Sequence, residues 1–510
     1  MPPARSATAS RSFPVARRAA RSSSSSARAS SFLAPHWGLL IVVGAGAALR
    51  VMAMYAYRPA LFFSDSWGYL FTAFTGHPVS LSYLRPNGYA ILIRLLTLPG
   101  RDLRELVAIQ NLSGIVVGVL VYAVLLRLRA GRLLAVLAAA LVILDGYRIT
   151  LEQYVMPDTL FTLSLLLAGL LLAWPGRQQD AKDAPERPGP GRALLAGLLL
   201  AASVVEREAA LFAVPAFLIY LVWVRVRLRT AVAFLLALAL PVLAYGALYQ
   251  SRVGVFGLSE SDGWTLYGRV AGFAVCPAAG IPSTERALCE TARQRAAHPG
   301  AATWYIWDGS SPAVRLFHGG HQNREVQERA NRTLRGFADR IIEHQPLDYA
   351  DATFSDVLRY FTPGATPFND SISATSLPRT SADEASSQRV RRRVLPHVHP
   401  SVNPPAGILR SYRNVVHVPR PVLALLVVAA LAALLLRTPS RREILLFAGS
   451  GVLVIIGTSG TAGFGLRYLL PAVPLLAIGG AVALNDLKER WLYRWAGKPS
   501  FDAELLSTSR

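Results

Sequence analysis

Long uncharged apolar segments alternate with short arginine-rich connections along most of the chain. An apolar run of about 20 residues is the length that crosses the hydrocarbon core of a bilayer. A single helix over 193–224 would be about 48 Å long, beyond a core of about 30 Å, so two short spans are expected there. The pattern predicts ten transmembrane helices, at about 36–56, 106–126, 133–147, 158–174, 193–205, 209–224, 230–249, 419–436, 443–458 and 464–484. The expected fold class is therefore an all-α polytopic membrane protein.

Composition and charge agree with this pattern. Apolar residues make up 52% of the chain and charged residues only 16%, whereas about a quarter of an ordinary soluble protein is charged. The 53 Lys and Arg exceed the 31 Asp and Glu, but the arginines fall in short loops between apolar segments. That placement is typical of the cytoplasmic side of a membrane protein, so we expect both termini inside and no nucleic-acid partner. The scarcity of lysine indicates a GC-rich coding sequence and a bacterial plasma membrane.

Five segments follow from this reading. They are a disordered cytoplasmic tail at 1–35, a catalytic module of seven spans at 36–249 with an outer loop at 58–105, an extracytoplasmic domain at 250–418, three last spans at 419–484, and a cytoplasmic tail at 485–510. The extracytoplasmic domain is expected to be small and loop-rich, with helical patterning around 322–344. Both cysteines of the chain, Cys276 and Cys289, lie in it. On the oxidising side of a membrane a disulfide between them is the favoured interpretation, and two free thiols are the alternative.

Ionisable residues next to the outer ends of the spans are the first candidates for function, because charge at membrane depth is costly. Asp65 follows the first span and is framed by aromatic residues in Phe62-Phe63-Ser64-Asp65-Ser66-Trp67-Gly68-Tyr69. A partly desolvated carboxylate there could act as a base. The alternative is that Ser64 or Asp65 caps a short helix running through Tyr69 and Phe74.

Three arginines are candidates for binding a lipid phosphate, because the guanidinium fork matches phosphate oxygens. Arg85 lies in the same outer loop, and its alternative role is to reach lipid headgroups. Arg207 lies between two short spans, where Glu206 and Glu208 could pair with it. Arg467 has no acidic neighbour in sequence and needs an anionic partner from the protein or a ligand.

Glu152 and Asp158 flank Met156-Pro157 between the third and fourth spans. Through a turn, two such carboxylates could hold Mg²⁺ or Mn²⁺ beside a phosphate, or contact an acceptor. Asp158 equally suits the first turn of a helix that starts at Pro157, where the helix dipole favours a negative charge. The sequence contains no phosphate-binding glycine loop and no dinucleotide fingerprint, so soluble nucleotide chemistry is not indicated.

Together, Asp65-Ser66-Trp67-Gly68-Tyr69, Arg85-Pro86-Asn87-Gly88-Tyr89, Glu152 with Asp158, Arg207, and Arg467-Tyr468-Leu469-Leu470-Pro471 form an ordered set. This set resembles the GT-C superfamily of integral-membrane glycosyltransferases, and within it the bacterial relatives of protein mannosyltransferases and aminoarabinose transferases. The resemblance covers about 36–484.

The resemblance implies that one sugar moves, with inversion, from a polyprenyl-phosphate carrier in the membrane lipid to an extracytoplasmic glycan, lipid or protein acceptor. It assigns the role of catalytic base to Asp65. It also implies that Arg85, Arg207 and Arg467 bind the donor phosphate, and that Glu152 and Asp158 contact a metal or the acceptor. The tyrosines of the same motifs, Tyr69, Tyr89 and Tyr468, are expected in the donor pocket. The family usually has a second acidic residue in the first outer loop, where this chain has Ser66.

Two other functions fit the same spans and arginines. A transporter of a phosphorylated lipid or glycan would use the arginines as an escort for the headgroup, and would not need Asp65. A structural protein of the cell envelope would use Asp65 only as a helix cap. Replacement of Asp65 by Asn distinguishes the three hypotheses.

Overall fold

The structure is a computed structural model that describes residues 36–75, 82, 84–97, 102–174, 187–277, 279–298, 300–318, 324–363, 395 and 397–495. The tail expected at 1–35 lies outside these residues, as does the end of the second tail, 496–510. The described chain is almost entirely helical, with one pair of two-residue strands.

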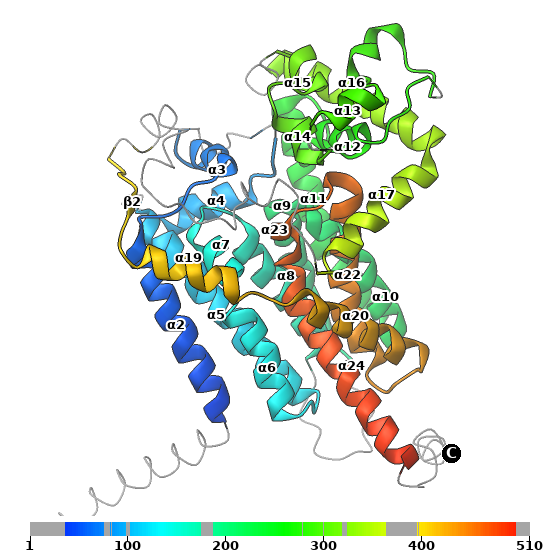
Figure 1. Ribbon diagram of the computed structural model, residues 1–510. Coiled ribbons are helices and arrows are strands. Elements are labelled where there is room, and N and C mark those ends of the chain that lie inside the picture. The colour runs from blue at the N-terminus through cyan, green and yellow to red at the C-terminus, as the bar shows by residue number, and fades with distance from the viewer. Residues whose placement is uncertain are drawn as a thin grey trace, which may run out of the picture.

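Apolar helices form a bundle that occupies the lower part of the molecule (Figure 1). They are α2 (Trp37–Ala56), α5 (Leu103–Arg127), α6 (Arg132–Ile143), α7 (Gly146–Gln153), α8 (Asp158–Ala173), α9 (Pro190–Glu206), α10 (Val214–Val224), α11 (Leu228–Val253), α20 (Arg420–Leu435), α22 (Ser450–Ala462) and α24 (Ala472–Trp495). The main buried core runs through them and is built largely of Ala, Val, Leu and Phe. Capping fixes some starts: the side chain of Asp102 accepts a hydrogen bond from the backbone N–H of Arg104 at α5, which satisfies one free amide of the first turn.

Four of the described helices are long and apolar enough to cross a membrane: Trp37–Ala56, Leu103–Arg127, Leu228–Val253 and Arg441–Ala462. The last of these combines α21 (Arg441–Ile444), a π-helical turn at Leu445–Gly449 and α22. The number rises to six if two bent pairs, α6 with α7 and α19 (Ala406–Val415) with α20, each form one span. The chain is therefore a multi-pass membrane protein.

The apolar stretch 193–224 is divided by a reversal at Arg207. This residue is extended (φ −159°, ψ 122°) and separates α9 from a 3-10 helix, Glu208–Ala213, that leads into α10. Arg192 at the start of α9 donates to the Leu171 and Trp174 carbonyls, and the hydroxyl of Tyr220 near the end of α10 donates to Leu172. Because all three carbonyls belong to the end of α8, the two helices run in opposite directions.

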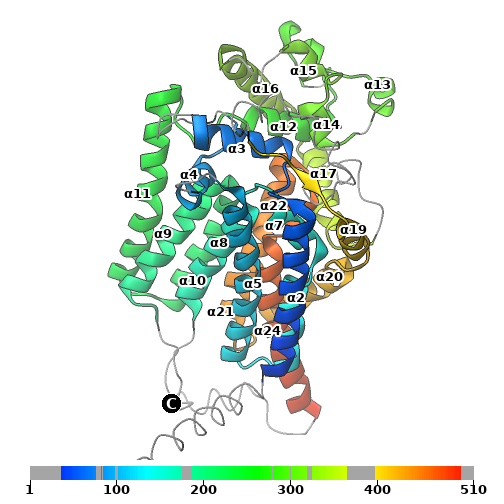
Figure 2. The same ribbon diagram turned by 90° about the vertical axis from the view of Figure 1, so that its left-hand side faces the viewer.

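A layer of short helices covers one end of the bundle. It contains α3 (Ser64–Thr75), α4 (Gly88–Leu96), α19 and α23 (Leu466–Leu469), and Figure 2 shows α3 and α4 between the bundle and the helices above. Strand β1 (Tyr57–Arg58) pairs antiparallel with β2 (Ser401–Val402). The segment that enters α19 is thus fastened to the segment that leaves α2.

Above this layer lie α12 (Asp262–Ala271), α13 (Ala292–Ala296), α14 (Ala302–Trp307), α15 (Pro312–Leu316) and α16 (Arg324–His344). From there α17 (Pro346–Arg359) descends to the bundle, where the Tyr349 hydroxyl donates to the Gly460 carbonyl of α22 (Figure 1). Helices α12, α14, α15 and α16 share a separate core that includes Trp264, Tyr267, Tyr305 and Phe337. We call this end of the bundle the domain end and the opposite end the loop end. The described part of this domain is largely helical, whereas a loop-rich domain was expected. The sequence does not reveal α13, α14 and α15, because helices of five or six residues are too short to show a periodic pattern.

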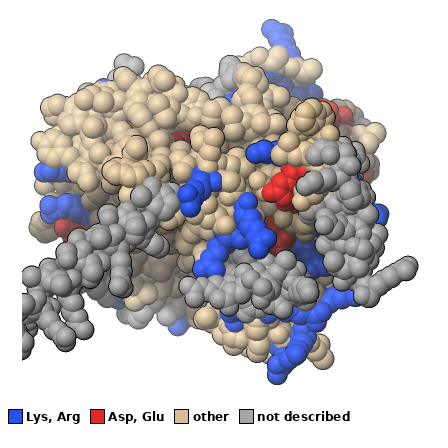
Figure 3. Space-filling view, turned by 90° about the horizontal axis from the view of Figure 1, so that it is seen from below, with Lys and Arg blue, Asp and Glu red and all other residues tan. Residues whose placement is uncertain are grey.

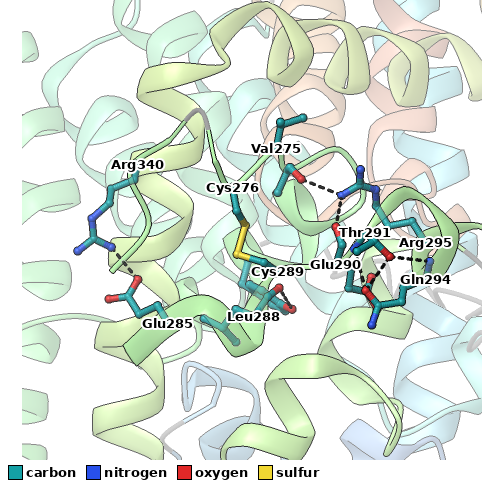
Figure 4. The surroundings of a disulfide bond; sticks show 12 residues. Val275, Cys276, Glu285, Leu288, Cys289, Glu290, Thr291, Gln294, Arg295 and Arg340 are labelled. Atoms are coloured by element: carbon teal, nitrogen blue, oxygen red, sulfur yellow. Dashed lines mark hydrogen bonds and ion pairs between the residues drawn. A yellow bond between two sulfur atoms is a disulfide. The ribbon is translucent and has the colours of Figure 1, made fainter. Parts of the chain in front are cut away.

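Cys276 and Cys289 form a disulfide in this domain, with an S–S distance of 1.99 Å. Figure 4 shows the bond beside two polar contacts on neighbouring elements. Arg340 of α16 pairs with Glu285 at 2.7 Å, and Arg295 of α13 donates to the Glu290 carbonyl at 2.9 Å. Cys276 is thus joined to Cys289, Glu285 is tied to α16 and Glu290 to α13.

Candidate functional site

The Asp65 carboxylate lies in the first turn of α3 at the domain end. The helix start is closed by other groups: the backbone N–H of Phe63 donates to the Ser66 hydroxyl at 2.9 Å, and Ser66 N–H donates to the Phe63 carbonyl at 3.0 Å. The described bonds of the Asp65 carboxylate come from side chains instead. Asp65 is therefore not needed as the cap of α3.

Two guanidinium groups from distant parts of the sequence form ion pairs with the Asp65 carboxylate. Arg85 Nη2 lies 2.6 Å from Oδ1, and Arg467 Nη1 lies 2.8 Å from Oδ2. The Asp65 side chain is 7% exposed. Burial raises the pKa of this carboxyl group, but Arg85 and Arg467 outweigh burial and lower the pKa to about 2. The carboxylate is fully ionised at neutral pH, and each of its oxygens is occupied by a cation.

Arg207 joins this group through a second carboxylate and a shared ring. It forms an ion pair with Asp158, whose side chain is 1% exposed at the start of α8. Its Cζ lies 5.1 Å from the centre of the Tyr468 ring, and Arg467 Cζ lies 5.3 Å from the same centre. The Tyr468 ring therefore holds two guanidinium groups next to each other at short range, an arrangement favoured by the negative face of the ring.

The remaining two predicted tyrosines extend the site along α3 and α4. Arg85 Cζ lies 5.9 Å from the centre of the Tyr69 ring, and the Tyr69 and Tyr89 rings pack edge to face at 5.1 Å. The Tyr89 hydroxyl donates to Gln110 Oε1 at 2.5 Å, and Gln110 Nε2 donates to the Glu152 and Tyr154 carbonyls. Tyr89 is thereby fixed from below by α5.

The ion-paired cluster carries excess positive charge. We define it as Asp65, Asp158, Arg85, Arg207 and Arg467, which join α3, α8, α23 and two loops. Three arginines less two carboxylates leave a net charge of +1. The three arginine side chains are 12–20% exposed, and an excess charge that is largely removed from water is costly unless an anion balances it. The cluster is therefore suited to binding one monoanion.

Glu152 lies outside the ion-paired cluster. Arg50 Nε donates to its Oε2 at 2.7 Å and Arg50 Nη2 to its Oε1 at 3.0 Å, and both side chains are at most 2% exposed. A Cβ at Gly114 would lie 1.8 Å from Glu152 Oε1, so α5 can pass this carboxylate only with glycine there. The pair ties α2 to α7 beneath the site. The sequence analysis overlooked Arg50, although a charge within an apolar span was a signal that could have found it.

Arg148 is a second residue that the sequence analysis missed. It is buried in α7, and its guanidinium group donates to the Leu470 carbonyl just after α23. This bond fixes the segment that carries Arg467 and Tyr468. Phe63 was also missed: its ring centre lies 5.9 Å from Arg467 Cζ, on the side of α3.

The carboxylates expected to bind a divalent cation do not form a site for one as arranged here. Mg²⁺ and Mn²⁺ prefer several oxygen ligands that converge on one point. Asp65, Asp158 and Glu152 each face a guanidinium group instead. Among the residues that the structure describes, no three His, Cys, Asp or Glu side chains gather as ligands.

An apolar cavity of about 430 Å³ lies between α9 and α11. Its lining residues are Leu198, Ala201, Ala202, Val205, Pro241, Ala244, Tyr245 and Leu248. The two helices approach closely at Gly197, where a Cβ would lie 2.5 Å from the Phe234 carbonyl. At the other end the cavity reaches Val205, two residues before Arg207. The hydroxyl of Tyr245 accepts from Asn87 Nδ2 at 2.9 Å, which links the cavity wall to the loop that carries Arg85.

Comparisons with known proteins match the part of the chain that carries most of this cluster. Residues 37–253 match the family model described as Dolichyl-phosphate-mannose-protein mannosyltransferase, abbreviated PMT. The matched range includes Asp65, Arg85, Asp158 and Arg207 but not Arg467. The match confirms the expected resemblance to the GT-C superfamily of membrane glycosyltransferases over somewhat less than half of the chain.

Two solved structures of the oligosaccharyltransferase from Archaeoglobus fulgidus are also similar. One is AglB in complex with an inhibitory peptide and a dolichol-phosphate, and the other is the apo form. Each is 16% identical to this chain with a TM-score of 0.35, and the similarity covers 91% of this chain and 52% of that chain. This chain thus spans about half the length of those proteins. No curated protein matches the sequence.

Proposed function

We propose that this protein transfers one sugar from a polyprenyl-phosphate carrier to a hydroxyl group of a glycan, lipid or protein acceptor at the domain end. The observation that carries the proposal is the net charge of +1 on the ion-paired cluster. A phosphodiester between a sugar and a polyprenyl chain has one negative charge and would neutralise it. The match to a family that uses a lipid-linked sugar supports the same donor class.

The apolar cavity between α9 and α11 supports a lipid carrier rather than a soluble sugar phosphate. Its lining includes exposed Leu198 and Leu248 on the outer surface of the bundle, so it opens toward the bilayer. Because it ends at Val205, a polyprenyl chain in it would present its phosphate toward Arg207. The polyprenyl tail would then lie in the apolar cavity, and the phosphate would lie beside the positively charged cluster.

Binding of the phosphate prepares Asp65 to act as the base. In the described state Arg85 and Arg467 hold the pKa of Asp65 at about 2, which makes it a weak proton acceptor. Phosphate oxygens compete for the same guanidinium donors. Transfer of these donors to the phosphate raises the pKa of Asp65 and frees a carboxylate oxygen for the acceptor hydroxyl.

The chemical step then balances with one base. The acceptor oxygen attacks the anomeric carbon as its proton passes to Asp65, and the bond between that carbon and the phosphate oxygen breaks on the opposite face with inversion. Polyprenyl phosphate leaves as a stable anion, so no general acid is required. Arg85, Arg207 and Arg467 stabilise the charge that develops on the leaving phosphate.

The proposed topology places the domain end outside the cytoplasm and both termini inside, in a bacterial plasma membrane. It also makes α8, α9, α10 and α24 further crossings, for ten in total. The exposed arginines of the turns at the loop end support this orientation, because short cytoplasmic loops are enriched in Lys and Arg. The disulfide supports an oxidising environment for the domain.

The test is sugar transfer by purified protein in nanodiscs, with a panel of radiolabelled polyprenyl-phosphate sugars and envelope extract as acceptor. We expect transfer from one donor by the wild type, and loss of donor binding and transfer in Arg467→Gln. Arg104→Gln is the matched control, because Arg104 lies near the domain end with a 68% exposed side chain and is expected to leave both unchanged. Equal donor affinity in Arg467→Gln and wild type would contradict the assignment of the cluster as the phosphate site.

A further inference from the structure

Three turns at the loop end share one unusual feature. Within the described residues three non-glycine residues have positive φ, and all three are arginines: Arg129 at 60°, Arg225 at 54° and Arg437 at 55°. They follow α5, α10 and α20, which all run from the domain end to the loop end. Left-handed backbone is unfavourable for a residue with a Cβ, and glycine is the usual choice at this position.

Each turn is a Schellman motif with arginine in the place of glycine. A backbone N–H closes each turn by donating to the carbonyl of the residue five positions earlier. The bonds are Ala130 to Leu125 (2.9 Å), Val226 to Leu221 (3.3 Å) and Thr438 to Ala433 (3.0 Å). The residue before each of these donors is the arginine. The same motif with the same residue at three separate helix ends indicates that the side chain offsets the unfavourable backbone.

The three side chains have no protein partner among the residues that the structure describes. Arg129, Arg225 and Arg437 are exposed, and no hydrogen bond or ion pair of their guanidinium groups is formed within the described ranges. Figure 3 shows patches of Lys and Arg on this face of the molecule. A favourable interaction with the helix dipole does not by itself require arginine, since any cation would supply it.

The residues around the three turns are those expected where lipid tails meet lipid headgroups. Next to each turn a leucine projects from the surface: Leu133 is 74% exposed, Leu228 80% and Leu435 82%. In a multi-pass membrane protein such side chains are covered by lipid tails. Two tryptophans lie beside further arginines at this level, with Arg127 Cζ 5.7 Å from the centre of a Trp174 ring and Arg441 Cζ 5.3 Å from that of Trp223, as expected at a membrane interface.

We propose that Arg129, Arg225 and Arg437 are binding sites for the phosphate groups of anionic phospholipids in the leaflet at the loop end. The guanidinium fork binds phosphate oxygens in pairs, and the left-handed turn holds each fork beyond the end of its helix. Further arginines flank each turn: Arg127 and Arg132, Arg227 and Arg229, and Arg441 and Arg442. This proposal does not rest on the proposed catalytic function.

The test separates the side chain from the backbone. Glycine suits a φ near 60°, so the triple variant Arg129→Gly, Arg225→Gly and Arg437→Gly is expected to fold and to melt at or above the wild-type temperature in detergent without lipid. Dioleoyl phosphatidylglycerol is then titrated into detergent-solubilised protein, with dioleoyl phosphatidylcholine and soluble glycerol 3-phosphate in parallel. Bound lipid is counted by native mass spectrometry, and melting is followed by tryptophan fluorescence.

We expect phosphatidylglycerol alone to bind and to raise the melting temperature of the wild type. The triple variant should bind it about fivefold more weakly at each of the three sites, because each site loses one arginine. The control removes the same charge at the domain end, by Arg104→Gln, Arg293→Gln and Arg332→Gln, and should bind as the wild type does. Wild-type affinity in the glycine variant would overturn the proposal, and so would equal stabilisation by glycerol 3-phosphate or by phosphatidylcholine.

Discussion

Replacement of Asp65 by Asn separates catalysis from donor binding. The substitution keeps the size of the side chain but removes the negative charge between Arg85 and Arg467. The net charge of the ion-paired cluster then rises from +1 to +2. We expect the donor phosphate to bind as tightly as in the wild type or more tightly, because the guanidinium groups no longer have to leave a carboxylate.

The expected loss of turnover is large. A positioned base contributes on the order of 100- to 10,000-fold to a reaction of this kind, and Asn has no site that accepts a proton. Single-turnover transfer with a saturating radiolabelled donor measures this loss without the contribution of binding. Asp102→Asn is the control: Asp102 is an exposed carboxylate near the domain end that caps α5, and Asn caps a helix equally well.

The ion pairs of Asp65 also contribute to the folding stability of the protein. The pKa of Asp65 falls from its usual 3.8 to about 2, which corresponds to about 2–3 kcal/mol of net stabilisation of the ionised form. A lowered pKa in the folded state contributes stability above the unfolded value, and the contribution is lost as pH falls through the folded value. The wild type should therefore lose about 2–3 kcal/mol of stability as pH falls from about 4 to about 2, a loss that Asp65→Asn does not show.

Two results would refute this reasoning. Turnover of Asp65→Asn within about threefold of the wild type, where the loss of a base should exceed 100-fold, would show that Asp65 is not the proton acceptor. A transporter of a phosphorylated lipid would then be the better hypothesis. Loss of donor binding together with turnover would show that Asp65 is required to hold the arginines in place, and would remove the assignment of a separate base.

Other predictions concern the groups around the site. Glu152→Gln leaves Arg50 buried without a charged partner and should lower the free energy of unfolding by about 3–5 kcal/mol; the melting temperature in detergent measures it, and Gly114→Ala should be comparably harmful since its Cβ meets the same carboxylate. Cys276→Ser should cost about 3 kcal/mol because a short loop is no longer closed, and a reducing agent should lower the melting temperature of the wild type but not of the variant. A melting temperature of Glu152→Gln equal to that of the wild type would contradict the prediction for the buried ion pair. An unchanged melting temperature of the wild type in reductant would contradict the prediction for the disulfide.

The residues of the ion-paired cluster could be anticipated from the sequence because the bilayer restricts them. Asp65, Arg85, Asp158, Arg207 and Arg467 lie at the ends of apolar segments, and buried charges there require partners of opposite sign. The sequence could not give the pairing itself. Arg467 was recognised as lacking a nearby acid, but its partner Asp65 lies 402 positions away, and only the packed bundle brings them together.

Glu152 illustrates the limit of this reasoning. Its position after an apolar segment resembles that of Asp158, and the sequence assigned both to one role. In the structure Asp158 begins α8 and faces Arg207, whereas Glu152 lies on α7 and faces Arg50 of α2. The bend of 43° between α6 and α7 turns Glu152 into the bundle, and a bend of this kind has no periodic signal in the sequence.

The ion pair between Asp65 and Arg467 has a consequence for biosynthesis. Arg467 lies 402 positions after Asp65, and synthesis of that stretch takes about 20–80 s at about 5–20 residues per second. During that interval Asp65 has Arg85 as a partner, but the cluster lacks the arginine of α23. A chain that terminates before α23 therefore carries Asp65 without Arg467. Its cluster would have two arginines and two carboxylates, and so no net positive charge.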